Sequence, residues 1–325
     1  MTGADWRPTS SPETMRRRAA MLERARAYFA SEQVIEVQTP LLSASTASEP
    51  QIESIAALPA RGRPLYLQTS PEYAMKRLLA AGVGDCYQIC PVFRDGESGR
   101  LHNPEFTMIE WYRVGYDVAG MQRDVLRLVG AVIGELRTLA PARHVSYREA
   151  IAAACGLDCR TASPDEIAAL LRTHGVAPAA TADWDRDTWL DLLMATVVGP
   201  RQGNDAPVFV HDYPAGQAAL ARLRDDRDGW PVAERFELYI DGIELANGFH
   251  ELGDAEEQRR RFEQDLATRR RRGQRLTPLD ERFLAALEQG LPDCAGVALG
   301  FDRLVMVALR LPSIDDAMTF PMDRA

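Results

Sequence analysis

The stretch FRDGESGRLHNPEFTMIEWY, residues 93–112, decides the fold of this chain. Its first residues close a β-rich run that starts at residue 85, and residues 105–113 form a second run. The residues between these runs, 95–104, are polar and predict a loop. We therefore expect two strands, residues 85–94 and 105–113, that are joined by a polar loop.

This strand–loop–strand unit groups residues that suit a nucleotide. Arg94 at a strand end offers a cation for phosphate, and Phe106 across the loop offers an aromatic face for a base. His102, Asn103 and Glu105 lie beside them in the sequence. A lone arginine is more often a surface charge and a lone phenylalanine a core residue, so the prediction depends on their occurrence together.

On the N-terminal side, apolar and small residues recur at helical spacing over residues 13–33, after a polar segment, 1–12, that we expect to be a flexible tail. A β-rich run follows and ends at Pro40. Residues 64–70 predict a strand, and residues 71–81 predict a helix with proline in its first turn.

On the C-terminal side, residues 119–200 have a mostly helical pattern without a chemical motif, so we expect a helical insertion between the motif-bearing parts. The elements expected after it are a strand at 207–213, a hairpin at 234–249, a helix at 254–271 and a glycine-punctuated strand and helix at 295–309.

The second hairpin turns at residues 241–242, an Asp-Gly pair that strongly predicts a two-residue turn. This turn would pair Leu238 with Leu245. It would also place Glu237 and Glu244 on one face as diagonal neighbours. Two such carboxylates repel unless a cation lies between them, and Mg²⁺ that carries nucleotide phosphates is the usual solution. A solvated, screened pair on an exposed face is the alternative.

Two further groups of residues could bind a ligand or a substrate. Gly296 and Gly300 would let the backbone approach a ligand closely, and Arg303 opens the following helix. A substrate with two ammonium groups needs a separate acidic partner for each positive end. The acidic and aromatic side chains that could serve such a substrate are Glu72, Glu110, Tyr112 and Glu251.

Composition narrows the functional classes. No apolar run approaches the length of a membrane span, and the arginines near the N-terminus are not followed by an apolar stretch, so we expect a cytoplasmic protein. The net charge of −9 argues against an extended nucleic-acid surface. The five cysteines are scattered without zinc-ligand spacing and predict free thiols. Lys76 is the only lysine, which coding bias can explain.

The order of these motifs resembles that of class II aminoacyl-tRNA synthetases: a helix and strand ending at Pro40, then FRDGESGRLHNPEF, then GVALGFDRLVM. The strings HNPEFTMIEWY and ELANGFHEL look like the lysyl branch of that family. The resemblance implies an α/β fold, with an antiparallel sheet flanked by helices, and one catalytic domain over residues 13–325.

The same resemblance implies a role for each motif residue. Arg94 and Arg303 would be catalytic and would bind the α- and γ-phosphates of ATP, and Glu237 and Glu244 would hold Mg²⁺. The further ATP-binding residues would be His102, Asn103, Phe106, Leu245 and Gly300. The residues that would bind the amino acid are Ser70, Pro71, Glu72, Glu110, Tyr112, Asn247, Glu251 and Ala298.

Four departures from the pattern of a full lysyl-tRNA synthetase matter. We expect no anticodon-binding domain, because the first motif starts close to Met1. The chain has Ser70 where those synthetases have alanine, and Ala298 where they have glycine. Gly96 stands where class II enzymes commonly have glutamate, and Glu97 follows it.

These features resemble the elongation factor P–lysine ligase family, which implies a homodimer that activates lysine or (R)-β-lysine with ATP and joins it to a lysine of elongation factor P. A truncated enzyme that charges tRNA is one alternative, for which only the run 269–272 hints at a basic surface. A free-standing ligase of the asparagine-synthetase type and a regulatory paralogue without catalysis are the others.

Overall fold

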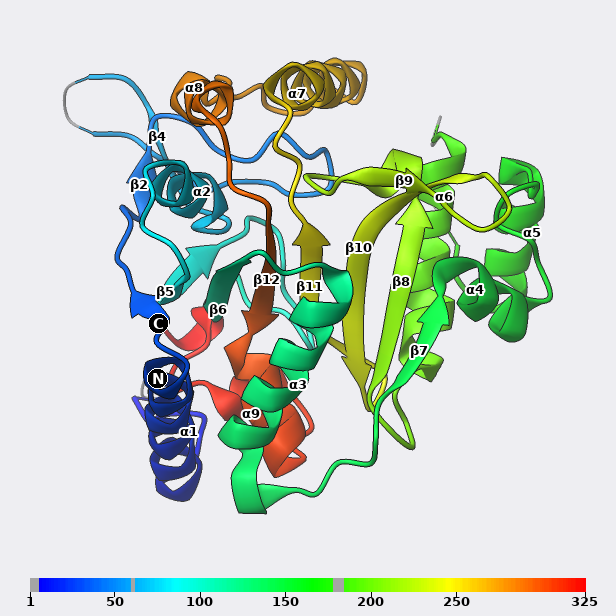
Figure 1. Cartoon of the computed structure of the whole chain (residues 1–325). Helices are drawn as coiled ribbons and strands as arrows, with labels where there is room; N and C mark the ends of the chain where they lie inside the picture. The colour runs from blue at the N-terminus through cyan, green and yellow to red at the C-terminus, as the bar shows by residue number, and fades with distance from the viewer. Residues whose placement is uncertain (1–5, 60–61, 178–183) are drawn as a thin grey trace, which may run out of the picture. The chain divides into compact units, whose positions relative to one another are not determined.

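The computed structural model describes residues 6–59, 62–177 and 184–325 of the chain. The chain divides into two compact units (Figure 1). The first unit comprises Met1–Thr138 and Glu251–Ala325, and the second comprises Leu139–His250.

The first unit contains two sheets. Its larger sheet has the strand order β1 (Ile35–Glu36), β5 (Cys86–Phe93), β6 (Glu105–Val114) and β12 (Cys294–Gly300). β1 is parallel to β5, and the other neighbours are antiparallel. The smaller sheet has the order β2 (Leu42–Ser43), β4 (Leu65–Leu67) and β3 (Ala56–Ala57).

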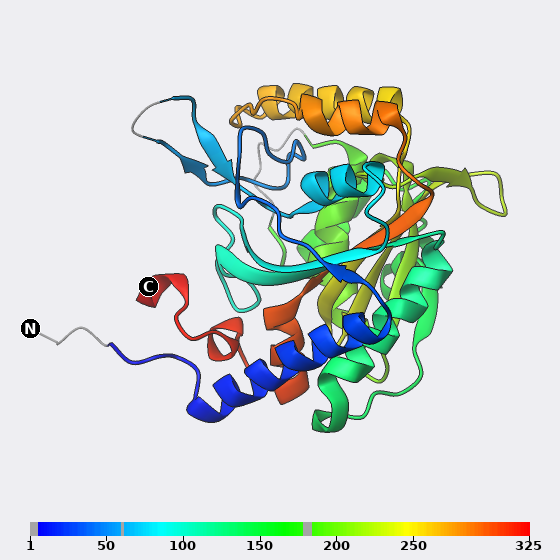
Figure 2. The same ribbon diagram turned by 60° about the vertical axis from the view of Figure 1, so that its left-hand side comes forward.

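Helices lie on both sides of the larger sheet. Figures 1 and 2 show α2, α7 and α8 on one side of β5 and β6, and α1, α3 and α9 on the other. These helices are α1 (Pro12–Ser31), α2 (Glu72–Ala80), α3 (Val118–Ile133), α7 (Ala255–Arg271), α8 (Glu281–Gln289) and α9 (Phe301–Leu309). Short helical turns complete the unit: η1 (Gly134–Leu136), η5 (Ile314–Ala317) and η6 (Met322–Arg324).

The second unit contains paired strands with helices packed against them. The strand order is β11 (Ile243–His250), β10 (Pro231–Ile240), β8 (Val208–Pro214) and β7 (Arg143–Ser146), and β9 (Leu223–Asp225) pairs with β10. The helices are α4 (Tyr147–Cys155), α5 (Pro164–Thr173) and α6 (Arg186–Leu193), with the short turns η2 (Met194–Val198), η3 (Gly199–Arg201) and η4 (Ala215–Gln217). An apolar core that includes Tyr147, Leu171, Leu193 and Val210 joins these helices to the strands.

The mixed α/β fold expected from the sequence is confirmed, and so are the strand–loop–strand unit and the second hairpin. The pairing of Leu238 with Leu245 is wrong, because a β-bulge shifts the register and Leu238 lies opposite Ala246. The stretch expected to be helical also contains strand β7. Of the expected tail, residues 1–5 lie outside the described part, and the N–H of Thr9 donates to the carbonyl of Thr319.

None of the helices in the described ranges is both long and apolar enough to cross a membrane.

Candidate active site

Strand β6 lines up the residues that the sequence assigned to the nucleotide and to the amino acid. Alternate residues of a strand share a face, so Phe106, Glu110 and Tyr112 point to the same side of the sheet. At about 3.3 Å per residue, Phe106 and Glu110 lie about 13 Å apart along the strand. β5 and β12 place Gln88 and Ala298 directly beside Glu110.

Arg94 lies directly over the aromatic ring of Phe106. Its guanidinium carbon is 5.2 Å from the ring centre, and its Nη1 is 3.7 Å from Oε1 of Glu97. Gly96 between them has a φ of +76°, a left-handed conformation that favours glycine over glutamate. The departure at Gly96 therefore has a backbone reason, and Glu97 supplies the acidic neighbour of Arg94.

Arg303, at the start of α9, is held by the loop that joins β5 and β6. Its Nε donates to the carbonyl of Leu101 at 3.1 Å, and its Nη2 lies 2.7 Å from Nε2 of His102. Burial, followed by the charge of Arg303, lowers the pKa of His102 below its ordinary value. His102 is therefore neutral near pH 7 and accepts this hydrogen bond, which orients the guanidinium.

The side chain of Asn103 is hydrogen-bonded to backbone atoms at the end of the loop. Its Nδ2 donates to the carbonyl of Glu105 at 2.6 Å, and its Oδ1 accepts from the N–H of Met322 at 3.0 Å. Asp302 fixes the start of α9 in a similar way, because its carboxylate accepts from the N–H of Thr107 at 2.6 Å. These bonds hold the ends of β6 and α9 together around Gly300, the residue at which β12 gives way to α9.

A buried acidic pocket lies farther along β6. Oε1 of Glu110 accepts from the hydroxyl of Tyr112 at 2.7 Å, and Oε2 accepts from the hydroxyl of Ser70 at 2.6 Å. Ser70 also accepts from the N–H of Glu72, which follows the N-cap residue Pro71 of α2. Burial, followed by the charge of Glu72, raises the pKa of Glu110 to about 8.

The same pocket contains the only lysine of the chain. Nζ of Lys76 lies 2.7 Å from Oε1 of Glu72 and 2.5 Å from Oε2 of Glu251. Burial raises the pKa of Glu251 to about 7, although Lys76 and the N–H of Gly296 both favour its charged form. Burial alone would lower the pKa of Lys76, but Glu251 and Glu72 hold it well above its ordinary value.

Gly296 fits between two of the pocket side chains. A Cβ at this position would lie 2.3 Å from Cε1 of Tyr112 and 2.4 Å from Oε1 of Glu251, closer than packed atoms approach. The glycine at residue 296 is therefore required by space alone. Ala298, on the same strand, packs with Phe106 against the apolar cluster of Cys90, Val92 and Met108.

The second unit holds the predicted metal ligands. The register of β10 and β11 places Asn247 opposite Glu237 and Glu244 opposite Tyr239, so all four share one face despite the bulge at Leu245. Glu237 accepts from the hydroxyl of Tyr239 at 2.6 Å. The guanidinium of Arg235 donates to Glu237 at 2.5 Å and to Oδ1 of Asn247 at 3.2 Å.

This face fits a magnesium ion that arrives with phosphates. Mg²⁺ prefers oxygen ligands and is commonly held by one or two carboxylates together with the phosphates of a substrate. Glu237 and Glu244 supply two such carboxylates on one face. Within the described ranges no group of three or more histidine, cysteine, aspartate or glutamate side chains is arranged to hold a metal without such a substrate.

Sequence reasoning missed two charged residues and misjudged a third. Lys76 follows Glu72 by one helical turn, a spacing that predicts an ion pair, and Arg235 precedes Glu237 by two strand residues, which places both side chains on one face. Arg269 belongs to the run that hinted at a basic surface. Its side chain is buried and donates to the carbonyls of Glu49 and Ile52, so this residue is not part of an exposed basic patch.

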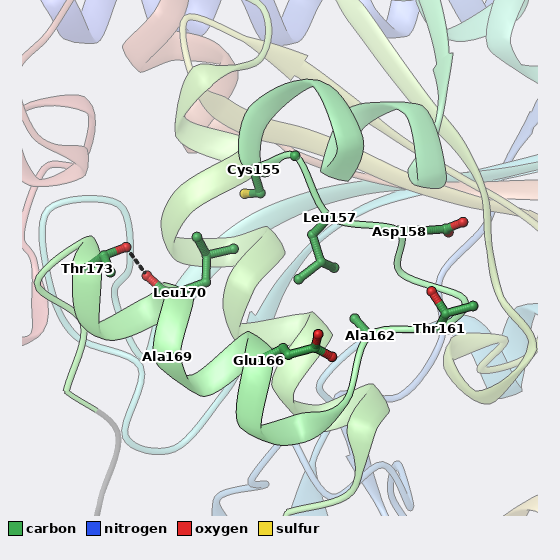
Figure 3. A pocket seen from close by; sticks show the side chains of 10 residues that line it. Cys155, Leu157, Asp158, Thr161, Ala162, Glu166, Ala169, Leu170 and Thr173 are labelled. Carbon is green, nitrogen blue, oxygen red and sulfur yellow. Dashed lines mark hydrogen bonds between the residues drawn. The ribbon is translucent and has the colours of Figure 1, made fainter.

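A shallow cavity of about 510 Å³ in the second unit contains none of the predicted site residues (Figure 3). It lies between α4 and α5, and its wall includes Cys155, Leu157, Thr161 and Leu170. The hydroxyl of Thr173 donates to the carbonyl of Leu170 at its edge, as Figure 3 shows.

Comparison with known proteins gives the same assignment over the whole chain. Residues 3–324 match the family described as tRNA synthetases class II (D, K and N). An elongation factor P--(R)-beta-lysine ligase of Photobacterium profundum is 45% identical over 327 residues, which cover 98% of this chain and 99% of the relative. Enzymes with the same name from Vibrio cholerae and Salmonella gallinarum are each 43% identical, over 100% and 99% of both chains respectively. The chain therefore belongs to the class II tRNA synthetase family, and within it to the elongation factor P–(R)-β-lysine ligases.

Proposed function

We propose that this protein is an ATP-dependent ligase that activates lysine or (R)-β-lysine as an adenylate and transfers it to a lysine side chain of elongation factor P. Relatives that match this chain over nearly their full length are named elongation factor P--(R)-beta-lysine ligases. Class II synthetase domains use ATP, and this chain contains such a domain.

The arrangement of β6 carries the proposal. One face of this strand has Phe106 under Arg94 and, four and six residues later, Glu110 and Tyr112 in the acidic pocket. An aminoacyl adenylate has a base at one end, a phosphate in the middle and an amino acid at the other end. The strand supports binding of such an extended molecule, with its ammonium groups in the acidic pocket.

In the first step, a carboxylate oxygen of the amino acid attacks the α-phosphorus of ATP. A new P–O bond forms, the bond to the β-phosphate oxygen breaks, and pyrophosphate leaves. Arg94 and Arg303 place positive charge where negative charge develops on the phosphates, and His102 orients Arg303 beforehand. Orientation of the two reactants contributes through proximity.

In the second step, a neutral amine of the acceptor protein attacks the carbonyl carbon of the mixed anhydride. The C–N bond forms, AMP leaves with the electron pair of the C–O bond, and the amine gives up one proton. The product is an amide, and no covalent enzyme intermediate is needed.

Glu237 and Glu244 would hold the magnesium ion, which supplies positive charge for the phosphates when it is bound. Arg235 already neutralises part of the charge of Glu237, which supports a role in holding that carboxylate in place.

A protein acceptor is favoured over tRNA. The net charge of −9 is unsuited to a phosphate-rich partner, and Arg269 of the basic run is buried. We also propose a homodimer through the region of the first motif, which exposes the apolar side chains of Ile35, Leu41 and Leu42. A reaction that uses ATP and a translation factor supports a cytoplasmic location.

The test combines the purified protein, ATP and Mg²⁺ with either L-lysine or (R)-β-lysine, in the presence of both elongation factor P and lysine tRNA. The intact mass of the factor and the acid-stable charging of the tRNA are measured in parallel. We expect a mass gain on the factor and no charged tRNA, and the two amino acids compared side by side identify the substrate.

Charged tRNA with an unmodified factor would instead identify a minimal synthetase. If neither product forms and no ATP–pyrophosphate exchange occurs, the protein is a regulatory paralogue and the proposal is wrong.

A further inference from the structure

Lys76 lies at the centre of the acidic pocket and binds two carboxylates from different elements. Its side chain is fully buried, and its ammonium contacts Glu72 of its own helix and Glu251, which lies at the start of the segment that leads to α7. Because the ammonium is shared, it fixes the distance between these two carboxylates.

Apolar packing holds Lys76 in this position. Its neighbours on α2, Met75 and Leu79, belong to the buried cluster that contains Tyr112. The ring of Phe283 from α8 lies 5.9 Å from the ammonium. A lysine side chain usually extends to solvent, so the inward orientation here is set by the pocket and not by the helix.

Lys76 supplies the ammonium that faces Glu251, with Nζ 2.5 Å from Oε2 of that carboxylate. Glu72 on α2 and Glu110 and Tyr112 on β6 are acidic or neutral neighbours, and Gly296 on β12 offers its N–H. Without the ammonium, Glu251 would face like charges in a buried site, which strongly disfavours its ionised form.

We propose that Lys76 is a positioning residue of the amino-acid pocket: its ammonium holds the carboxylates of Glu72 and Glu251 in place as fixed partners for the ammonium groups of the substrate. This inference rests on the proposed function, since it requires a lysine-type substrate. Lys76 itself stays protonated between two carboxylates, so it does not compete with the acceptor amine for the adenylate.

The test compares Lys76→Met with Arg113→Met in lysine-dependent ATP–pyrophosphate exchange. Methionine is similar in length to lysine but has no charge. Arg113 is also a buried cation of the first unit, and it pairs with Glu32, Asp85 and Asp124 instead of with the pocket. Arg113→Met therefore controls for the loss of a buried ion pair.

For Lys76→Met we expect the KM for lysine at pH 7 to rise at least about tenfold. The reason is that the ionised fraction of Glu251 falls about tenfold for each unit by which its pKa exceeds the working pH. The KM for ATP should stay within about twofold of the wild-type value. The defect should shrink as the pH rises, since Glu251 regains its charge. Arg113→Met should lower the thermal stability without this separation of the two KM values.

Equal effects on both KM values, or a defect that does not vary with pH, would overturn the inference and leave Lys76 a structural ion pair. If the wild-type protein shows no lysine-dependent exchange, the proposed function fails and this inference with it.

A second measurement needs no variant. Because the chain has a single lysine, protein labelled with [6-¹³C]lysine gives one side-chain NMR signal. We expect this signal to keep the shift of an ammonium form up to about pH 10.4, where an ordinary lysine is half neutral, and to move when unlabelled substrate lysine is added but not when ATP alone is added. A signal that titrates normally and ignores the substrate would overturn the proposal.

Discussion

Replacement of Gly296 by alanine should damage the amino-acid pocket more than the fold. The added Cβ would lie 2.3 Å from a ring carbon of Tyr112 and 2.4 Å from a carboxylate oxygen of Glu251. Ordinary contact begins at 3.4 Å, so these side chains or strand β12 must move by about 1 Å. Gly296 has no positive φ, so the whole effect is steric.

That displacement should lower both the stability of the protein and the rate of the reaction. Overpacking of a tight site costs about 1–3 kcal/mol, which corresponds to a fall of a few degrees in Tm. A displacement of about 1 Å at a site that orients a substrate can cost on the order of a hundredfold in rate. We therefore expect kcat/KM for lysine to fall on the order of a hundredfold, while the KM for ATP changes little.

The assay is lysine-dependent ATP–pyrophosphate exchange, with thermal unfolding measured on the same preparation. Gly253→Ala is the matched control, because its Cβ would meet only Leu291, at 3.8 Å. A Gly296→Ala protein with the wild-type KM and kcat for lysine would refute the reasoning, since Glu251 and Tyr112 would then have no part in substrate binding. An equal loss in the Gly253→Ala protein would also refute it.

Three other predictions concern the nucleotide and the charge of the pocket. Phe106→Ala should raise the KM for ATP by about tenfold or more and leave the KM for lysine unchanged, because stacking of a base on an aromatic ring contributes about 1–3 kcal/mol; equal changes in both constants would contradict this. Gly300→Ala should leave Tm unchanged, since its Cβ would meet only the side chain of Arg303, at 3.7 Å. It should raise the KM for ATP, because the nucleotide is expected to lie against this glycine. An unaltered KM for ATP would exclude that contact. Lysine should bind more tightly as the pH rises from about 6 to about 8.5, because Glu251 and Glu110 must be ionised to hold ammonium groups and their pKa values are raised to about 7 and about 8. Calorimetry in buffers of different ionisation heat should detect proton release on binding. No proton release at pH 7 would contradict an initially protonated Glu110. The same raised values mean that the folded protein retains protons that the unfolded chain has lost, so these two groups make the free energy of unfolding decrease as the pH rises from about 4.5 to about 8.

Elements with a strong local pattern could be predicted from the sequence. Strands β5 and β6, helix α9 and the turn of the second hairpin all lie where periodicity or an Asp-Gly pair placed them. Helix α8 carries an apolar face on only nine residues and was not predicted, and β9 has only three residues and exposed side chains. Short elements of this kind are formed by their neighbours more than by their own sequence.

The bulge at Leu245 shows the limit of register arguments. A two-residue turn predicts a regular ladder, and the first two pairs after the turn follow it. The extra residue then moves Asn247 opposite Glu237, where Arg235 contacts both. No local signal in the sequence marks such a bulge, because it depends on packing around the strand.

The predicted amino-acid residues were grouped by resemblance, but their charge balance could only come from the structure. The pocket contains three carboxyl groups, those of Glu72, Glu110 and Glu251, and one ammonium, that of Lys76, which contacts Glu72 and Glu251. If Glu110 is protonated in the free protein, one negative charge remains for the substrate, and a second appears when Glu110 ionises beside an incoming ammonium. An amino acid with a neutral side chain would leave Glu110 protonated and would form only one of the two ion pairs. We therefore expect the pocket to favour a substrate with two ammonium groups, through the same charge balance that stabilises it when it is empty.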